Sequence, residues 1–257
     1  MEQAKLFVCK SCSTPVPTGH KFCGRCGAAV PGDVLAMKTS YYGALQTPGR
    51  AKVVFVRGEG VEGVSYQLNA TEHVIGRSGH LVLSDDPFVS PRHANLFYRD
   101  GHLVAHDEES HNGVFLRVRE PTKLAFGELV YVGEQLLRVE RAGTAPNDDE
   151  GGVTYYTSPH HPGQLRVVQV LEGGADGAAV VRADAVTVGR EGADMCFIDD
   201  QYVSPTHCRI TLEDGDIVVT DLGSRNGTYV RIKGDQDLLH GDYLFIGRNL
   251  LRVEITV

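Results

Sequence analysis

The chain contains two similar nonapeptides, DDPFVSPRH at residues 85–93 and DDQYVSPTH at residues 199–207, which lie 114 residues apart. The same offset relates Asn112-Gly113 to Asn226-Gly227. A period this long is typical of duplicated domains rather than of a solenoid, whose repeats are much shorter. These motifs therefore predict that one domain has been duplicated within the chain.

The flanks of the nonapeptides set the boundaries of the two copies. Downstream, GEQLLRVE at 133–140 corresponds to GRNLLRVE at 247–254, again at an offset of 114. Upstream, VIGR at 74–77 aligns with TVGR at 187–190 at an offset of 113, so one residue has been gained or lost. We therefore predict a first repeat over 51–141 and a second repeat over 164–257.

Each repeat has the pattern of short strands joined by tight turns. In the second repeat the segment 209–213 alternates in polarity, and Asp214-Gly215 is a hairpin signal; Asp100-Gly101 is its counterpart in the first repeat. No stretch shows a convincing amphipathic helix. The sequence therefore predicts an all-β fold with two antiparallel β-sandwiches in tandem.

Composition and charge narrow the classes of function. The 257 residues carry a net charge of −8, which argues against a general nucleic-acid binder, since such a protein needs basic surface. No apolar run approaches the roughly 18–20 residues that span a bilayer. The first ten residues have no apolar stretch of the kind that marks a cleaved signal peptide, so we expect a cytoplasmic protein.

Four cysteines crowd into the N-terminal residues, as two C-x2-C pairs formed by Cys9 with Cys12 and Cys23 with Cys26. Four thiolates at tetrahedral corners satisfy Zn²⁺, so we predict one structural zinc ion. His20 as a replacement ligand, free cysteines and a redox pair stay open as alternatives. The run FCGRCG at 22–27 resembles the second knuckle of short zinc ribbons at the N-termini of many bacterial proteins, which implies a zinc ribbon over 1–30.

Two polar segments read as linkers. Residues 31–50 separate the cysteine cluster from the first repeat, and residues 142–163, with NDDEGG at 147–152, form a flexible acidic linker between the repeats. The remaining cysteines, Cys196 and Cys208, align with Val82 and Ala94 of the first repeat. Small apolar equivalents predict that both cysteines pack in a core.

Three motifs recur in order in both repeats: Gly-Arg at a strand end, Ser-x-x-His, and Asn-Gly. This order and spacing resemble the forkhead-associated (FHA) domain, and the resemblance covers both repeats. It implies a β-sandwich that binds phosphothreonine peptides through loops at one end. A phosphate carries about −1.5 to −2 charges near pH 7, and Arg and Ser are suitable donors for its oxygens.

The resemblance also implies a role for each motif residue. Arg and Ser would contact the phosphate, Asn would hold the peptide main chain, and His93 and His207 would brace the loops. The residue two after the Ser, Arg92 or Thr206, could add a second contact to phosphate. The candidate phosphothreonine-binding residues are Arg77, Ser90, Arg92, Asn112, Arg190, Ser204, Thr206, Arg225 and Asn226.

Neither repeat matches the family pattern fully. The first repeat has Val114 where a Thr usually follows Asn-Gly, and His111 where a small hydroxyl residue or Arg is common. The second repeat keeps SRNGT at 224–228 but has Thr206 in place of Arg92. We predict that the second repeat is the stronger binder.

These observations predict a non-enzymatic signalling adaptor that reads threonine phosphorylation left by a Ser/Thr kinase. Its partners would be phosphothreonine-containing proteins, including kinase substrates or the kinase itself, with no membrane. The net charge argues against nucleic acid, and a role of the ribbon on nucleic acid or the ribosome stays open as a further alternative. A phosphate-independent docking or structural module stays open as the alternative. A hydrolase built on Ser90, His93 and Asp85 lacks an oxyanion loop or nucleophile elbow. An intramolecular phosphothreonine also stays open, at Thr39, Thr47, Thr144, Thr154 or Thr157.

Overall fold

The computed structural model describes residues 7–12, 15–16, 21–23, 25–30, 50–56, 62–143, 149–150, 153–154 and 163–256. The chain forms two compact units, Met1–Pro48 and Gly49–Val257. His20, residues 31–49 of the first predicted linker and most of the second linker lie outside the described residues. The same holds for Thr39, Thr47, Thr144 and Thr157.

In the N-terminal unit, two short hairpin-like segments carry the cysteine pairs. Strand β1 (Phe7–Val8) pairs antiparallel with β2 (Pro15–Val16), and an isolated bridge joins Phe22 to Ala29. Val16 and Val30 are buried together with Cys9 and Cys23. The apolar interior is therefore very small, as expected of a module of this size.

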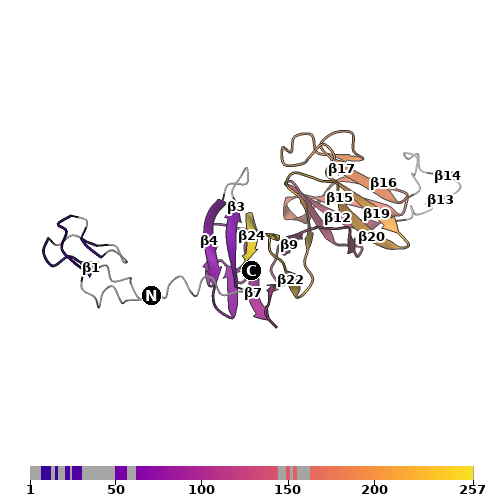
Figure 1. The fold of residues 1–257 in the computed structure, drawn as a ribbon. Coiled ribbons are helices and arrows are strands. Elements are labelled where there is room, and N and C mark those ends of the chain that lie inside the picture. Colours follow the sequence, from indigo (N-terminus) through magenta and orange to yellow (C-terminus); the bar gives the residue numbers. More distant parts are fainter. Residues whose placement is uncertain are drawn as a thin grey trace. The chain divides into compact units, whose positions relative to one another are not determined.

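The larger unit is all-β, with one short 3₁₀ turn at Glu172–Gly174 among its described residues (Figure 1). Its first-repeat strands are β3 (Ala51–Val56), β4 (Glu62–Leu68), β5 (Glu72–Gly76), β6 (Leu81–Val82), β7 (Ala94–Arg99), β8 (His102–Asp107), β9 (Val114–Arg117), β10 (Thr122–Leu124), β11 (Leu129–Val132) and β12 (Gln135–Arg141). Its second-repeat strands are β15 (Leu165–Val170), β16 (Asp176–Arg182), β17 (Ala185–Gly189), β18 (Met195–Cys196), β19 (Cys208–Glu213), β20 (Asp216–Asp221), β21 (Thr228–Arg231), β22 (Gln236–Leu238), β23 (Tyr243–Ile246) and β24 (Asn249–Ile255). Between the repeats, β13 (Asp149–Glu150) and β14 (Val153–Thr154) pair with each other.

The predicted Asp-Gly hairpins are confirmed. Asp100 and Gly101 both have positive φ, as do Asp214 and Gly215, and each pair closes the tight turn between two antiparallel strands. Nearly all the pairing is antiparallel, as expected. The exceptions are the two-residue strands β6 and β18, which run parallel to β5 and β17.

Two sandwiches are assembled from these strands, and each draws on both repeats. The first sandwich packs the five-stranded sheet β22-β8-β7-β5-β6 against the strands β9-β23-β24-β3-β4. The second packs β10-β20-β19-β17-β18 against β21-β11-β12-β15-β16. Strands β9 and β21 pair with each other, so the second layers of the two sandwiches form one continuous ten-stranded sheet.

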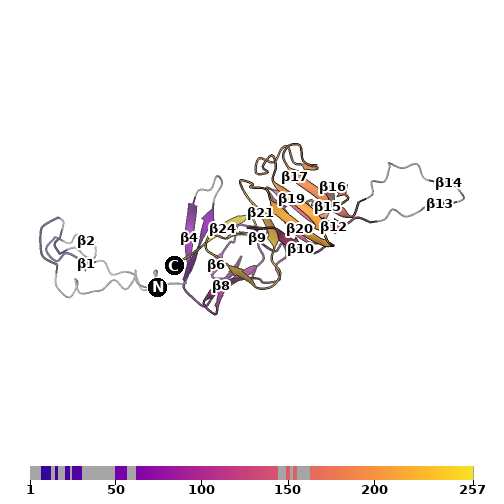
Figure 2. The same ribbon diagram turned by 45° about the vertical axis from the view of Figure 1, so that its right-hand side comes forward.

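The repeats thus exchange their C-terminal segments. After Arg117 the first repeat crosses to the second sandwich and supplies β10, β11 and β12; after Arg231 the second repeat crosses to the first sandwich and supplies β22, β23 and β24. In Figure 1 the yellow C-terminal strand β24 accordingly lies beside the purple strand β3, and in Figure 2 β10 and β12 lie among the orange strands. The repeats 51–141 and 164–257 are units of sequence, whereas the folded sandwiches are composites.

Two buried carboxylates fasten the exchanged segments. Asp86 accepts hydrogen bonds from the backbone N–H of Arg248 (2.7 Å) and from Asn249 Nδ2 (2.8 Å). Its repeat partner Asp200 accepts hydrogen bonds from the backbone N–H of Glu134 and from Gln135 Nε2, both at 2.8 Å. Each contact joins the N-terminal part of one repeat to the exchanged C-terminal hairpin of the other.

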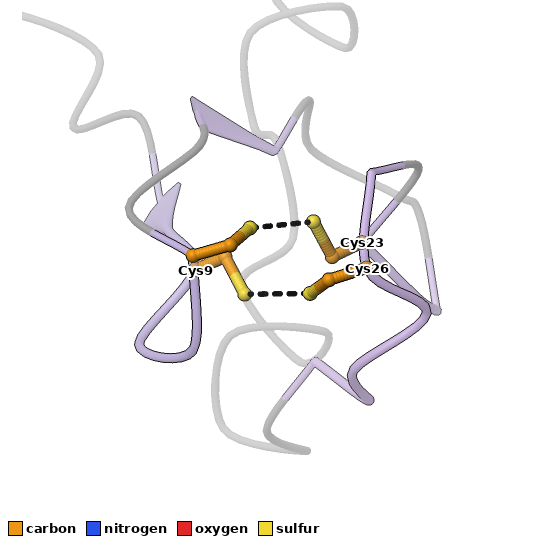
Figure 3. Close-up of side chains that lie close together, drawn as sticks. Cys9, Cys23 and Cys26 are labelled. Atoms are coloured by element: carbon orange, nitrogen blue, oxygen red, sulfur yellow. Dashed lines mark hydrogen bonds between the residues drawn. The ribbon is translucent and has the colours of Figure 1, made fainter.

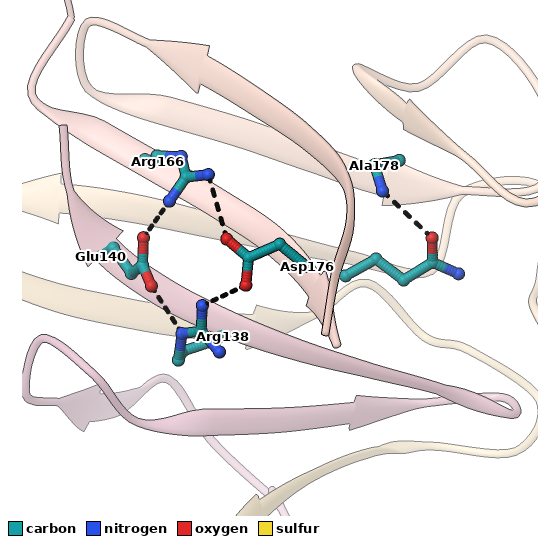
Figure 4. A network of polar contacts seen from close by, with 6 residues as sticks. Arg138, Glu140, Arg166, Asp176 and Ala178 are labelled. Carbon is teal, nitrogen blue, oxygen red and sulfur yellow. Dashed lines mark hydrogen bonds and ion pairs between the residues drawn. The ribbon is translucent and has the colours of Figure 1, made fainter. Parts of the chain in front are cut away.

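Ion pairs lie on the outer face of the ten-stranded sheet, on the strands where the two repeats meet. In the second sandwich, Arg138 and Arg166 both pair with Glu140 and Asp176 (Figure 4). Hydrogen bonding to Arg138, despite partial burial, keeps the pKa of Glu140 below its usual value. In the first sandwich the corresponding pairs are Arg252–Glu62, Arg252–Glu254 and Lys52–Glu254.

One packing prediction is confirmed and one is wrong. Cys208 is fully buried in the core of the second sandwich, and burial raises the pKa of its thiol to about 12. Cys196 is exposed. It follows the buried Met195 in the two-residue edge strand β18, and successive side chains of a strand point to opposite faces.

Candidate functional site

In both repeats the Gly-Arg motif lies at the end of a strand, directly against the Ser-Pro loop. The backbone N–H of Arg77 donates to Ser90 O (3.1 Å), and that of Arg190 donates to Ser204 O (3.0 Å). A Cβ on Gly76 would lie 2.2 Å from Pro91 O, and one on Gly189 would lie 2.1 Å from Pro205 O. Glycine is therefore required before each arginine, because the loop passes too close for a side chain.

The serine hydroxyls tie this loop to the Asn-Gly loop. Ser90 Oγ accepts a hydrogen bond from the backbone N–H of His111, and Ser204 Oγ accepts one from the backbone N–H of Arg225, both at 3.1 Å. Because each hydroxyl acts as acceptor here, its own proton is free to be donated outward. The serines thus lie where a hydroxyl can be offered to an anion.

The two histidines brace the same loops from beneath. The backbone N–H of Ser90 donates to His93 Nδ1 (3.0 Å), and His93 Nε2 bonds Gly113 O (2.9 Å); His207 makes the same bonds with Ser204 (3.0 Å) and Gly227 (3.0 Å). This network assigns the neutral tautomer with the proton on Nε2. Both rings are fully buried. Since both ring nitrogens bond backbone, neither histidine is available as a base for the neighbouring serine hydroxyl.

The asparagines connect the Asn-Gly loop to the residue two before the serine. Asn112 Nδ2 donates to Phe88 O (2.8 Å), and Asn226 Nδ2 donates to Tyr202 O (2.9 Å). One N–H and the side-chain carbonyl of each amide are left over from this bond. Each repeat therefore carries its Arg, Ser and Asn on three neighbouring loops.

The cations at the two sites differ in their partners. Within the described residues, the guanidinium groups of Arg77, Arg190 and Arg225 form no hydrogen bond or ion pair. Arg92 instead pairs with Glu108, with Nη2–Oε2 at 2.9 Å and Nε–Oε2 at 3.1 Å. Thr206, which replaces Arg92 in the second repeat, is exposed.

An aspartate anchors each Asn-Gly loop, and sequence reasoning missed both. Asp221 accepts hydrogen bonds from the hydroxyls of Ser224 (2.6 Å) and Thr228 (2.7 Å) and from the backbone N–H groups of Gly223 (3.0 Å) and Ser224 (2.9 Å). Burial opposes ionisation of this carboxyl, but the hydrogen bonds from Ser224 and Thr228 prevail and lower its pKa. The offset of 114 relates Asp221 to Asp107, which is the signal that could have identified the pair.

The four N-terminal cysteines form a separate candidate metal centre (Figure 3). Their sulfur atoms all lie within 4.8 Å of one another, and the pairs Cys9–Cys26 and Cys12–Cys23 are each 3.6 Å apart. A tetrahedral Zn²⁺ with Zn–S bonds of about 2.3 Å needs sulfurs about 3.8 Å apart, whereas a disulfide needs about 2.05 Å. The arrangement therefore fits a tetrahedral ion and excludes disulfides between these pairs.

Hydrogen bonds within this cluster act differently on its thiols: at Cys26 the backbone N–H of Ala28 is outweighed by the Cys12 thiol and by burial, which raise the pKa to about 12. Backbone N–H groups of Cys26 and Arg25 lower the pKa of Cys23 to about 6, and those of Ser11 and Cys12 lower the pKa of Cys9. A thiolate is the form of cysteine that binds a metal. The four predicted ligands thus lie together, and two of them, Cys9 and Cys23, favour the form that binds a cation.

Comparison with known proteins finds a family similar to two segments of the larger unit. The model of the FHA domain family matches residues 73–133 and 186–247. Each match begins in the strand before Gly-Arg and ends at the turn of the last hairpin of its repeat. Each repeat therefore contains a segment that matches the FHA domain family.

The relatives found are bacterial. An oxoglutarate dehydrogenase inhibitor of Corynebacterium diphtheriae is 34% identical over 94 residues, which are 36% of this chain and 64% of that protein. A second inhibitor of the same name, from Corynebacterium efficiens, is 39% identical over 64 residues, 24% of this chain and 45% of that one. The glycogen accumulation regulator GarA of Mycolicibacterium smegmatis is 42% identical over 64 residues, 24% of this chain and 40% of its own. The chain thus matches less than two thirds of the length of each.

One solved structure, of phosphothreonine-dependent FHA domain interactions, aligns with 80% of this chain and 96% of its own at 12% identity and a TM-score of 0.31. Among the described residues, no helix is long and apolar enough to cross a membrane.

Proposed function

We propose that the protein is a phosphothreonine-binding signalling adaptor with two recognition sites and an N-terminal zinc ribbon. The first site consists of Arg77, Ser90, Arg92 and Asn112, and the second of Arg190, Ser204, Thr206, Arg225 and Asn226. The observation that carries the proposal is the recurrence of one geometry in both repeats. In each repeat, an arginine whose guanidinium group forms no hydrogen bond or ion pair within the described residues lies on a loop next to those of a serine and an asparagine.

The chemistry of these groups suits a phosphorylated threonine. The guanidinium group supplies charge and paired donors to the phosphate oxygens, and the serine hydroxyl supplies one more directed donor. The asparagine, which lies one loop away, can hold the peptide main chain through its free N–H and carbonyl. Such a site binds a phosphorylated chain and releases it unchanged; the nearby His93 and His207 brace backbone N–H groups through Nδ1.

The test is a phosphothreonine peptide-library screen against the full chain, repeated with Arg77→Ala, with Arg190→Ala and with both. We expect selection of phosphothreonine over threonine, weakened by each substitution and abolished by the pair. Binding that ignores phosphorylation and both arginines would favour the alternative, a phosphate-independent docking module. Partners identified in this way would be kinase substrates or a kinase, and the peptide sequences would indicate which.

For the N-terminal unit, the proposed zinc ion is held by Cys9, Cys12, Cys23 and Cys26. When bound, the metal supplies a structural cross-link that a core of this size cannot provide. Four reduced thiols in one site also suit the cytoplasm, where thiols stay reduced. Metal analysis of the full chain purified without chelator should give close to one zinc equivalent, and Cys23→Ser should lose it. Lack of zinc, or oxidised cysteine pairs after reducing lysis, would contradict the zinc ribbon.

A further inference from the structure

The strand pair at the crossover connects the two recognition sites. Strands β9 and β21 run antiparallel, with Arg117 opposite Tyr229 and Arg231 opposite Phe115. Each strand follows directly on an Asn-Gly turn. Because the strands are antiparallel, the last residue of each lies beside the Asn-Gly turn that begins the other. The last residues are Arg117 and Arg231, which occupy the same repeat position.

Both arginines pack on the opposite turn. Gly113 has φ +84°, and a Cβ built on it would lie 2.4 Å from Arg231 Nε; Gly227 has φ +86°, and a Cβ there would lie 2.2 Å from Arg117 Nε. The glycines therefore do more than permit the turn. They leave the space that an arginine from the other repeat fills.

The polar contacts of the two arginines differ. Arg231 Nη2 donates to Asp107 Oδ2 and to Ser110 O, both at 3.3 Å, and so joins the anchoring aspartate of the first site to its recognition loop. Arg117 instead lies over the ring of Tyr243, 5.5 Å from its centroid. Only one of the two equivalent arginines thus bonds the aspartate beneath the loop it covers.

The reason lies in the residue after each Asn-Gly. Thr228 donates its hydroxyl to Asp221, but the first repeat has Val114 at this position. The Asp107 side chain is only 10% exposed, and besides Arg231 it accepts the backbone N–H of Ser110 (2.9 Å). A buried carboxylate needs donors, and a valine offers none. Arg231 supplies the donor that the threonine would have supplied.

We propose that Arg231 is a positioning residue of the first recognition site. The first site is thus completed by a residue of the second repeat, whereas the second site is anchored by residues of its own repeat. The functional part of this inference rests on the proposed function. Arg231 touches no ligand; it holds Asp107 and the loop 108–113, and this loop presents Asn112 and the N–H of His111 that orients Ser90. The loss of Thr at 114 is thereby compensated from a residue more than a hundred positions away.

The test uses the full chain with Arg190→Ala, so that phosphothreonine peptide binding reports the first site. Arg231→Met keeps the aliphatic stem and removes the donor, and we expect it to weaken binding about threefold to tenfold. Arg117→Met is the matched control and should leave first-site binding unchanged. Adding Val114→Thr to Arg231→Met should restore binding to within about twofold, because the new hydroxyl can bond Asp107.

Amide hydrogen exchange over 108–113 provides a readout that needs no ligand. Arg231→Met should speed exchange in this loop, Arg117→Met should not, and Val114→Thr should restore protection. If the parent chain binds no phosphothreonine peptide, the proposed function fails at this site, while exchange still decides the role of Arg231. Unchanged exchange in Arg231→Met, or equal effects of Arg231→Met and Arg117→Met on the loop, would overturn the inference, as would failure of Val114→Thr to restore it.

Discussion

The two recognition sites share one framework and differ in how it is supported. Both use a buried neutral histidine to bridge the Ser-Pro loop and the Asn-Gly loop, with nearly equal distances. Beneath the second site, Asp221 is satisfied by hydroxyls and N–H groups of its own loop, whereas beneath the first site Asp107 depends on Arg231. Duplication has therefore kept the elements that face a ligand and allowed their support to diverge.

A second difference concerns charge. The first site carries an ion pair, Arg92 with Glu108, at its edge, and the residue equivalent to Glu108 in the second repeat is Leu222. The second site has Arg225 where the first has His111, and the Arg225 guanidinium has no partner within the described residues. Both differences favour stronger anion binding at the second site.

The largest effect should come from removing the anchoring aspartates. Asp221→Ala leaves the buried hydroxyls of Ser224 and Thr228 without their acceptor, so we expect a loss of about 3–5 kcal/mol in the free energy of unfolding. Asp107→Ala removes fewer bonds and should cost about 1–2 kcal/mol. Urea denaturation of the full chain measures both; equal costs would show that the two loops are supported alike.

The pH dependence of the Asp221 effect follows from its lowered pKa. A carboxyl whose folded pKa lies below the unfolded value of about 3.9 contributes stability that is present above that pH and lost as the pH falls through the folded pKa. The difference in stability between the parent chain and Asp221→Ala should therefore be constant near neutral pH and shrink below about pH 4.

The next largest effect concerns the phosphate contacts. Arg190→Ala should weaken phosphothreonine peptide binding at the second site about tenfold to a hundredfold, since a charge-assisted contact contributes about 1.5–3 kcal/mol. Arg77→Ala should have a smaller absolute effect because we expect the first site to bind more weakly. Calorimetry on the full chain measures both, with the exposed Arg209→Ala on β19 as the matched control. If Arg209→Ala weakens binding as much as Arg190→Ala, the loss of binding arises from the lower overall positive charge and not from a specific phosphate contact.

One substitution should reduce the difference in charge between the first and the second site. Glu108→Gln removes the carboxylate that holds Arg92 and frees its guanidinium group for a phosphate. An exposed ion pair contributes roughly 0.2–1 kcal/mol, so we expect first-site binding to tighten about twofold to fivefold in the Arg190→Ala background. Glu109→Gln, the exposed neighbour, is the control and should change binding little. No gain in Glu108→Gln would show that Arg92 lies out of reach of the ligand.

Much of this comparison could be predicted from the sequence because the motifs are local. A strand end, a Ser-x-x-His turn and an Asn-Gly turn each form from neighbouring residues, and both Asp-Gly hairpins are where the pattern places them. The same locality explains the error at Cys196. Alignment with Val82 indicated a core position, but Val82 is itself 57% exposed on the equivalent edge strand.

The exchange of C-terminal segments could not be predicted, because several residues that form its contacts are the same in both repeats. Asp86 and Asp200 occupy one repeat position, as do Arg138 and Arg252, and Glu140 and Glu254. Either hairpin therefore offers similar polar groups and similar apolar faces to either sandwich. What distinguishes the exchanged arrangement is the pairing of β9 with β21, a long-range contact that leaves no local signal.

The smallest expected effect is a difference between the two sandwiches in how their thermal stability changes as the pH falls. Burial lowers the pKa of His73, which accepts the N–H of Ala70 on Nε2 (3.0 Å) and lies edge-on to Tyr66; the second repeat has Val186 at this position. Protonation would remove the acceptor. Since the folded pKa lies below the unfolded value of about 6.5, this stability is complete above that pH and is lost as the pH falls through the folded pKa.

The Tm of the full chain should therefore fall between pH 7.5 and 5.5, and His73→Gln should flatten that fall. Burial also lowers the pKa of His207, so part of the fall should persist in His73→Gln. An unchanged slope in that variant would show that the acid response does not arise at His73.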